Sequence, residues 1–425
     1  MPAGSYIVAR VAVGVIGLGY VGLPLAVAFA EGGEDVVGVD VDSDKVSAIR
    51  AGESYIEDVA SEALGAVGDR LRVSRRYADL AGCEAVVIAV PTPLTRNREP
   101  DLGALLSTAR SLANVLQEGQ LVILESTTYP GTTRETLGPL LEESGLKAGR
   151  DFNLAFSPER IDPGRTDFTL KNTAKVVGGL TDECRDRAVA LYQRVCNEVV
   201  SVATPEVAEL TKLLENIFRS VNIALVNEMA MLCDRMGIDI WEVVDAAATK
   251  PYGFMSFKPG PGMGGHCLPV DPFYLAWRAR EFDQPTEFIE LAGEVNQKMP
   301  HFCVEKIGTA LNDHAKAIRG SRIVILGVSY KAGVGDLRES PALKVMKLLR
   351  ERGADLSYCD SYVPSLPDFD LEAEEVTEAL DEADAAVILT AHPDLDVEDV
   401  ALRAPLVVDF RGVTRNIEAA HVVRL

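Results

Sequence analysis

One cysteine in a glycine-rich segment carries the strongest chemical signal in this chain. Cys267 follows Gly264, Gly265 and His266, and the carboxylate of Asp271 stands four residues further on. Glycines beside a thiol let the backbone approach a ligand closely, and a thiolate is a strong nucleophile. Most free cysteines are simply small buried apolar residues, and we keep that interpretation for the other six. They are Cys83, Cys184, Cys196, Cys233, Cys303 and Cys359.

A second chemical motif lies near the N-terminus. Gly17, Gly19 and Gly22 have the G-x-G-x-x-G spacing between an expected strand and an expected helix. In such a motif the glycines allow a tight turn, a close approach to pyrophosphate and close helix packing. Asp40 ends the next expected strand, where a carboxylate can bind ribose hydroxyls. Its charge would repel a 2′-phosphate, so the motif predicts NAD and not NADP.

A hydride acceptor and a nucleophilic thiol in one chain suggest a particular oxidation. The thiol would add to an aldehyde, and the adduct would be oxidised to a thioester and hydrolysed to an acid. The starting compound would be an aldehyde, or an alcohol that passes through its aldehyde.

Other polar groups have positions that suit such a site. Four residues spaced three or four apart form one stripe on an expected helix, although a solvated helix face has the same pattern. Glu159 and Arg160 follow a strand, and Lys331 and Arg338 follow the first strand of the C-terminal part, where basic groups can clamp phosphates. Ordinary surface charge is the alternative for both pairs. The stripe consists of Glu209, Lys212, Asn216 and Arg219.

Alternating strands and helices must position these groups. Helical stretches such as 102–116 and 183–196 separate the apolar runs in the first half, which predicts a parallel doubly wound sheet. The expected strands are 11–16, 35–41, 85–90, 121–124, 154–156, 175–177 and 199–202.

A long helix is expected from the middle of the chain. Thr204 can cap it, Pro205 suits its first position, and its apolar pattern continues to Gly237. A helix of this length often links domains and pairs with its copy in a dimer. More helix is expected at 241–248 and from residue 286 onward.

The C-terminal part repeats the α/β pattern on a smaller scale. Its expected elements are a strand at 322–327, a helix at 341–352 and strands at 356–359, 386–389 and 406–408. The predicted fold class is α/β, with two Rossmann-like parallel-sheet domains joined by a helical domain with a long central helix. The predicted domain boundaries are 1–203, 204–318 and 319–425.

Composition narrows the range of partners. The net charge of −22 argues against nucleic acid, which clustered Lys and Arg bind, but a few local basic residues can still hold a phosphorylated substrate. Seven cysteines without a C-x-x-C pair fit reduced thiols in a cytoplasm. No metal-ligand spacing is present. The apolar run 11–30 looks like a signal peptide, but its glycine pattern and Pro24 favour a strand-turn-helix, and no other stretch could span a membrane.

These motifs resemble the UDP-glucose/GDP-mannose dehydrogenases along nearly the whole chain. That family oxidises the C6 hydroxyl of a nucleotide sugar to a carboxylate with two NAD. The resemblance implies an NAD-binding domain first, a central dimerisation domain with the Cys267 loop, and a UDP-sugar-binding domain last. The matching segments are 17–22, Val90-Pro-Thr92-Pro, Glu125-Ser-Thr127, Ser157-Pro-Glu159, Glu209-Leu-x-Lys212-x-x-x-Asn216, the Cys267 loop and Arg338-Glu-Ser-Pro341.

The resemblance also implies roles for single residues. Cys267 would attack the C6 aldehyde, and Lys212 and Asn216 would stabilise the oxyanion. Asp271 would order water and tune Lys212, Glu159 would assist thioester hydrolysis, and Thr127 would hold water or cofactor. The implied cofactor contacts are Gly17, Gly19, Tyr20, Val21, Gly22, Asp40, Lys45, Thr92, Thr127 and Arg338. The implied substrate contacts are Glu159, Arg160, Ile161, Lys212, Asn216, Arg219, Gly264, Tyr330, Lys331 and Arg411.

Within the family, the loop sequence favours one branch. Glucose-oxidising members typically have Gly-Gly-Ser-Cys, whereas this chain has Gly-Gly-His-Cys. That form is similar to the N-acetylhexosamine branch, with UDP-GlcNAc a closer match than UDP-ManNAc, and UDP-glucose as an alternative. The expected partners are a UDP-sugar and a second copy of the chain, in a homodimer or higher homo-oligomer.

Two other classes of function stay open. A hydroxy-acid-type reductase also joins a Rossmann unit to a long helix and uses a helix lysine, but it lacks the loop thiol and the second α/β domain. An inactive NAD- or nucleotide-sugar-binding protein would need a dead site, whereas every candidate catalytic position here carries a competent side chain.

Overall fold

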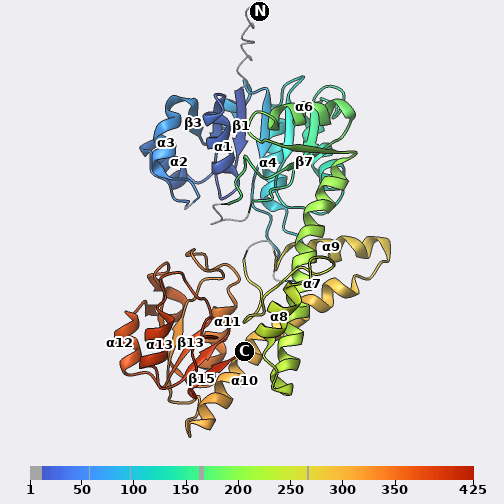
Figure 1. Cartoon of the computed structure of the whole chain (residues 1–425). Coiled ribbons are helices and arrows are strands. Elements are labelled where there is room, and N and C mark those ends of the chain that lie inside the picture. The colour runs from blue at the N-terminus through green and yellow to red at the C-terminus, as the bar shows by residue number, and fades with distance from the viewer. Residues whose placement is uncertain (1–11, 57, 96, 162–166, 266–267) are drawn as a thin grey trace, which may run out of the picture. The chain divides into compact units, whose positions relative to one another are not determined.

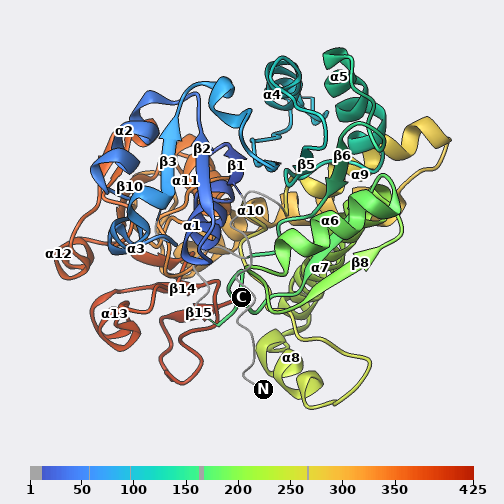
Figure 2. The same ribbon diagram turned by 90° about the horizontal axis from the view of Figure 1, so that it is seen from above.

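The computed structural model describes residues 12–56, 58–95, 97–161, 167–265 and 268–425. Contacts divide the chain into two compact units. The first contains Met1–Glu215 with Trp277–Phe282, and the second contains Asn216–Ala276 with Asp283–Leu425. Figures 1 and 2 show the same ribbon from two directions.

The first unit is built on an eight-stranded sheet with the order β3-β2-β1-β4-β5-β6-β7-β8. The first six strands of that order run parallel, as in a dinucleotide-binding fold. β7 runs antiparallel to β6, and β8 runs parallel to β7. The strands are β1 (Ala12–Ile16), β2 (Asp35–Val39), β3 (Leu71–Ser74), β4 (Ala85–Ile88), β5 (Leu121–Leu124), β6 (Asn153–Phe156), β7 (Lys175–Gly179) and β8 (Val199–Val202).

Helices cover both faces of this sheet because successive side chains of a strand point to opposite faces. Val13 and Val15 pack with α1, α3 and α6, whereas Ile16 packs in the cluster that contains α4 and α5. Figure 2 shows α4 and α5 on one side of β5 and β6 and α6 on the other. The helices are α1 (Gly22–Glu31), α2 (Ser43–Ala51), α3 (Ser61–Val67), α4 (Gly103–Ala113), α5 (Gly138–Leu141) and α6 (Asp182–Tyr192).

One helix of 32 residues, α7 (Pro205–Met236), runs through the boundary between the two units. The Thr204 hydroxyl accepts the Val207 N–H at 3.4 Å near its start. Pro205 occupies the first helical position, where its missing N–H costs nothing. At the other end Gly237 has φ +67°, a left-handed conformation that suits a glycine after a helix.

The second unit contains a five-stranded parallel sheet with the order β10-β9-β13-β14-β15. Its strands are β9 (Arg322–Leu326), β10 (Asp355–Cys359), β13 (Ala385–Ile388), β14 (Val407–Asp409) and β15 (Val422–Arg424), and a small hairpin pairs β11 (Ser365–Leu366) with β12 (Leu371–Glu372). Its helices are α8 (Ile240–Ala248), α9 (Asp271–Ala279, which crosses into the first unit), α10 (Glu287–Asp313), α11 (Pro341–Glu351), α12 (Val376–Asp381) and α13 (Val397–Arg403).

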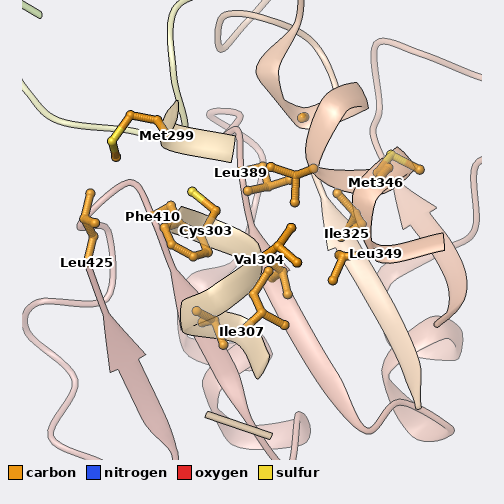
Figure 3. Close-up of a cluster of buried hydrophobic side chains, with 14 of the residues drawn as sticks. Met299, Cys303, Val304, Ile307, Ile325, Met346, Leu349, Leu389, Phe410 and Leu425 are labelled. Atoms are coloured by element: carbon orange, nitrogen blue, oxygen red, sulfur yellow. The ribbon is translucent and has the colours of Figure 1, made fainter. Parts of the chain in front are cut away.

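The largest core of the second unit lies between its sheet and α10. Figure 3 shows Cys303, Val304 and Ile307 of α10 beside Ile325 of β9 and Leu349 of α11. All five side chains are fully buried. α12 and α13 cover the other sheet face, where Val324 and Ile388 lie. Burial of this apolar surface fixes α10 on the sheet.

The predicted fold class is confirmed by the two Rossmann-like sheets and the long helix. The observed strands and helices agree with the expected ranges to within a few residues, and α7 ends at Met236 as its pattern indicates. Some details differ. The strands β3, β11, β12 and β15 were not anticipated, and β7 enters the first sheet antiparallel to β6. The division at residues 203 and 318 stays a prediction.

Candidate active site

The glycine turn after β1 has the geometry that a dinucleotide needs. Gly17 has φ +88°, and a Cβ there would lie 2.4 Å from the Ala89 carbonyl oxygen. A Cβ on Gly22 would lie 1.7 Å from the Gly17 carbonyl oxygen, so both positions exclude a side chain. Nothing lies within 4 Å of a Cβ built on Gly19. The turn is therefore closed toward the protein and open at Gly19, where a pyrophosphate would approach α1.

Asp40 closes the second side of this cradle. It is buried, and its two carboxylate oxygens accept the Leu18 N–H at 2.7 Å and the Asp42 N–H at 2.9 Å. The Lys45 ammonium lies 3.9 Å away. Each carboxylate oxygen has a second lone pair, so Asp40 can also accept ribose hydroxyls. These residues fit NAD, which when bound supplies a hydride acceptor.

Two predicted cofactor contacts are joined by a hydrogen bond. The Thr92 hydroxyl donates to the Thr127 carbonyl at 2.6 Å, and the Ser126 hydroxyl donates to the Val90 carbonyl at 2.6 Å. These bonds tie the loop after β4 to the loop after β5. Tyr20 and Val21 lie between the second and third glycines of the turn, and the Tyr20 side chain is about half exposed.

Three of the four residues of the polar stripe on α7 are buried, so the stripe is not a solvated helix face; Arg219 is partly exposed. Glu209, Lys212 and Asn216 are 0%, 7% and 2% exposed. Glu209 accepts the Gly131 N–H at 2.6 Å, and it accepts the N–H and the hydroxyl of Thr133 at 2.9 and 2.7 Å. Burial raises the pKa of Glu209 to about 7, although these donors act in the opposite direction. Glu209 therefore fixes the start of α7 on the first unit.

Lys212 and Glu159 are brought together in the first unit. The Lys212 ammonium donates to the backbone carbonyl of Glu159 at 2.5 Å. The Glu159 carboxylate accepts the N–H groups of Arg160 and Ile161 at 2.7 and 2.5 Å. Burial acts to raise the pKa of Glu159, but Lys175, the Ile161 N–H and Lys212 outweigh it and hold the pKa below its usual value. Glu159 is therefore a carboxylate at neutral pH.

A second set of predicted residues meets in the second unit. The Asn216 amide donates to the Asp271 carboxylate, and the Asn216 side-chain oxygen accepts a guanidinium N–H of Arg219 at 2.8 Å. Asp271 begins α9 and is 1% exposed. These contacts fix the orientation of the Asn216 amide and leave its second N–H for another acceptor.

The loop before Cys267 packs closely on the segment between β9 and α11. Gly265 has φ +94° and donates its N–H to the Arg338 carbonyl at 3.0 Å. A Cβ on Gly264 would lie 2.8 Å from Tyr330 Cβ. The glycines at both positions are therefore needed for this close contact. His266 and Cys267 lie outside the described residues.

Several predicted ligand contacts have partners within the chain. The Arg160 guanidinium pairs with Glu215 at 2.7 Å and donates to the Ala174 carbonyl at 2.5 Å. Arg338 pairs with Asp336 at 2.5 Å. The Lys331 carbonyl accepts the Ser329 hydroxyl at 2.8 Å. Burial lowers the pKa of Arg411, although Asp409 acts in the opposite direction. Their contacts with cofactor or substrate stay predictions.

The structure also groups residues that the sequence did not single out together. In the first unit, the Lys175 ammonium pairs with the Glu125 carboxylate, and Tyr192 donates its hydroxyl to Glu125 at 2.6 Å. In the second unit, Asp360 accepts the Val328 N–H at 2.8 Å and lies 3.0 Å from His392. Sequence patterns predicted the helix that carries Tyr192 and the strands near the other residues, but no local signal marked their pairing.

The six described cysteines lack the access to solvent that a reactive thiol needs. Cys83, Cys184, Cys196, Cys233, Cys303 and Cys359 are free and buried. Burial raises the pKa of Cys83 and Cys196 to about 11 and that of Cys359 to about 12. These three are therefore neutral thiols at neutral pH.

Within the described part of the chain, no helix is long and apolar enough to cross a membrane.

Comparison with known proteins gives matches along most of the chain. Residues 11–196, 206–298 and 324–416 match the NAD binding domain, the central domain and the UDP binding domain of the UDP-glucose/GDP-mannose dehydrogenase family. The UDP-N-acetyl-D-mannosamine dehydrogenase of Pyrococcus horikoshii is 36% identical over 421 residues, 97% of this chain and 98% of that protein. The UDP-N-acetyl-D-glucosamine 6-dehydrogenase of Pseudomonas aeruginosa is 37% identical over 354 residues, 83% of each protein.

Solved structures with similar chains include two archaeal enzymes. That of the UDP-D-ManNAc dehydrogenase from Pyrococcus horikoshii has a TM-score of 0.89 at 34% identity, covering 97% of this chain and 98% of that one. That of a UDP-glucose dehydrogenase from Pyrobaculum islandicum also has a TM-score of 0.89, at 30% identity, covering 100% of this chain and 98% of that one.

Replacing Asp40 should weaken cofactor binding. In Asp40→Ala we expect NAD affinity to fall by about 1–3 kcal/mol, because charge-assisted hydrogen bonds to the ribose are lost, and discrimination against NADP to relax. Asp40→Asn is the matched control, since its amide oxygen can still accept an N–H of the turn. Titration of both variants with NAD and NADP measures the effect. Wild-type NAD affinity in Asp40→Ala would show that the adenosine ribose binds elsewhere.

Proposed function

The chain belongs to the UDP-glucose/GDP-mannose dehydrogenase family, and we propose that it oxidises the C6 hydroxyl of a UDP-N-acetylhexosamine to the carboxylate. It is an NAD-dependent nucleotide-sugar dehydrogenase. UDP-N-acetylglucosamine is the first candidate for its substrate. The burial of Lys212 and Asn216, one turn apart on α7, carries the proposal, because a buried cation and a buried amide can stabilise a developing oxyanion.

Cys267 is the proposed nucleophile. Its thiol adds to the C6 aldehyde to form a thiohemiacetal, and oxidation of that adduct gives a thioester. Water then attacks the thioester carbonyl, the C–S bond breaks and the thiol is regenerated. Support comes from the glycine loop before Cys267, which contacts Tyr330 and Arg338 closely.

The surrounding side chains have distinct proposed tasks. Lys212 and Asn216 stabilise the oxyanion, and Asp271 supports this task because it accepts one N–H of the Asn216 amide. Asp271 also orders water and tunes Lys212. Glu159 takes a proton from the water that hydrolyses the thioester, a role that its ionised state supports. Thr127 holds water or cofactor near the reacting carbon.

Substrate preference is proposed from the relatives and the loop sequence. Relatives similar to this chain are named for UDP-N-acetyl-D-mannosamine and UDP-N-acetyl-D-glucosamine, and the Gly-Gly-His-Cys loop favours the same branch. A solved UDP-glucose dehydrogenase is also similar to this chain. UDP-ManNAc and UDP-glucose are therefore the two alternative substrates.

A homodimer built on α7 is also proposed. Apolar side chains along this helix are exposed at intervals of three, four or seven residues and so form one stripe. Such a stripe is unfavourable in water, and a second copy of the helix would cover it. The exposed residues are Val207, Leu210, Leu214, Phe218, Leu225, Met229, Leu232 and Met236.

The count of NADH formed per sugar tests the reaction. We expect two NADH per uronic acid, whereas one NADH would mean a simple alcohol dehydrogenase and none would mean a binding protein. Cys267→Ser should bind NAD normally and form no acid at a measurable rate, because a serine hydroxyl is far less ionised than a thiol. Full turnover by this variant would remove Cys267 from the covalent role.

A panel of UDP-sugars tests the substrate. We expect a higher kcat/KM for UDP-N-acetylhexosamines than for UDP-glucose, with UDP-GlcNAc ahead of UDP-ManNAc, because the loop before Cys267 has the form of that branch. Initial rates of NADH formation at matched concentrations provide the measurement. A clear preference for UDP-glucose would contradict the substrate proposal and leave the reaction type intact.

Subunit mixing tests whether Arg338 serves a site in the neighbouring subunit. Arg338→Ala and Cys267→Ala should each be inactive, and some mixed dimers should regain activity because one site then has both residues intact. Arg338→Lys should also be impaired, since a point charge does not reproduce the guanidinium fork. No recovered activity after verified subunit exchange would show that Arg338 serves its own chain.

A further inference from the structure

A buried lysine lies between two carboxylates at the edge of the first sheet. The Lys175 side chain is 3% exposed, and its ammonium pairs with Glu125 and lies 3.4 Å from a carboxylate oxygen of Glu159. The Glu125 side chain is fully buried, and its other oxygen accepts the Tyr192 hydroxyl at 2.6 Å. The Lys175 ammonium also lies 5.2 Å from the centre of the Tyr192 ring. Lys175 is thus enclosed by these three residues.

The antiparallel strand explains how Lys175 reaches this place. Glu125 follows β5 and Glu159 follows β6, so both leave the sheet at its carboxyl edge. β7 runs antiparallel to β6, and therefore its first residue, Lys175, lies at the same edge. The register pairs Ala155 with Gly179 and Phe156 with Gly178. Continued to the start of β7, it places Lys175 opposite Glu159, which agrees with the 3.4 Å distance.

The charges in this cluster are unequal in number. One lysine serves two carboxylates, and burial makes each unpaired charge costly. Burial raises the pKa of Glu125 to about 7 although Lys175 lowers it, whereas Glu159 keeps a pKa below its usual value. Glu125 therefore takes up a proton at higher pH than Glu159 does, and neighbouring carboxyls with different pKa values are a common arrangement for acid–base work. The ionisable groups of the cluster itself are Glu125, Glu159, Lys175 and Tyr192. Cys196 and Lys212 are the ionisable neighbours that face it.

We propose that Lys175 is a positioning residue for the hydrolytic step, with Glu125 and Tyr192 holding its ammonium against Glu159. The inference rests on the proposed function, in which Glu159 acts on the water that cleaves the thioester. Water attacks the thioester carbonyl, its proton passes to the Glu159 carboxylate, and the C–S bond breaks to release the Cys267 thiolate. Lys175 keeps Glu159 ionised and oriented before this step without touching the substrate.

A pair of variants isolates the charge of Lys175. Glu125→Gln keeps one acceptor oxygen for Lys175, and its amide N–H can donate to the Tyr192 hydroxyl. Glu159 is then the only carboxylate beside Lys175. The double variant Glu125→Gln/Lys175→Met removes the ammonium without leaving Glu125 as an unpaired buried charge, which Lys175→Met by itself would do. Hydrolysis of the acyl-enzyme is measured across pH by rapid quenching and intact-protein mass, together with NAD affinity and thermal stability for each variant.

The sign of the expected shift follows from the role of Glu159. A carboxylate base works only when ionised, so the hydrolysis rate rises as pH passes upward through its pKa. Loss of the neighbouring cation raises that pKa. The acid limb, which is the part of the pH profile where the hydrolysis rate rises with pH, should therefore lie about one pH unit or more higher in the double variant than in Glu125→Gln. Glu125→Gln itself should have its limb at or below the wild-type position. Lys175→Arg should keep the wild-type limb because it restores the charge.

Controls separate this inference from the proposed function. Lys147→Met breaks an exposed pair with Glu142 and should leave the pH profile unchanged. If wild-type protein forms an acyl-enzyme and two NADH per sugar, but the double variant and Glu125→Gln have the same acid limb, only the role of Lys175 is overturned. If wild-type protein forms no acyl-enzyme, both proposals are overturned.

Discussion

Burial of the polar face of α7 is the constraint on which the rest of the site depends. A buried polar group without a partner costs about 1–3 kcal/mol, and a buried charge costs more. Each group of this face therefore needs a hydrogen-bond partner at a fixed place. Glu209 accepts the N–H groups of residues 131 and 133, Lys212 donates to the Glu159 carbonyl, and Asn216 donates to the Asp271 carboxylate. These contacts determine which loops lie beside the helix and which of their polar groups lie against it.

The cofactor cradle depends on a different constraint, which is steric. Backbone oxygens occupy the space where Gly17 and Gly22 would carry side chains, whereas Gly19 faces open space. Asp40 then ties the turn to the end of β2 through the Leu18 N–H. The cradle is thus built mainly from backbone, and the selection of NAD over NADP that we predict for Asp40 stays a prediction.

Many elements were predictable from the sequence because their signals are local. Strand and helix periodicity, the Thr204-Pro205 start of α7 and the Gly237 end all depend on neighbouring residues, and the structure agrees with them to within a few residues. The short strand β3 was missed because four residues carry little periodic signal. The glycine turn and Asp40 were also predictable, since their spacing reflects one strand-turn-helix-strand unit.

By itself, the sequence determined the fold class, the cofactor cradle, the family and the set of candidate catalytic residues. Only the tertiary structure decided that Glu209, Lys212 and Asn216 of the α7 stripe are buried, because periodicity cannot tell a solvated polar face from one that packs on loops far away in the chain. Only it placed Lys175 against Glu159, because that contact requires β7 to run antiparallel to β6. Strand direction depends on how the chain returns to the sheet, and residues 175–179 do not encode it locally.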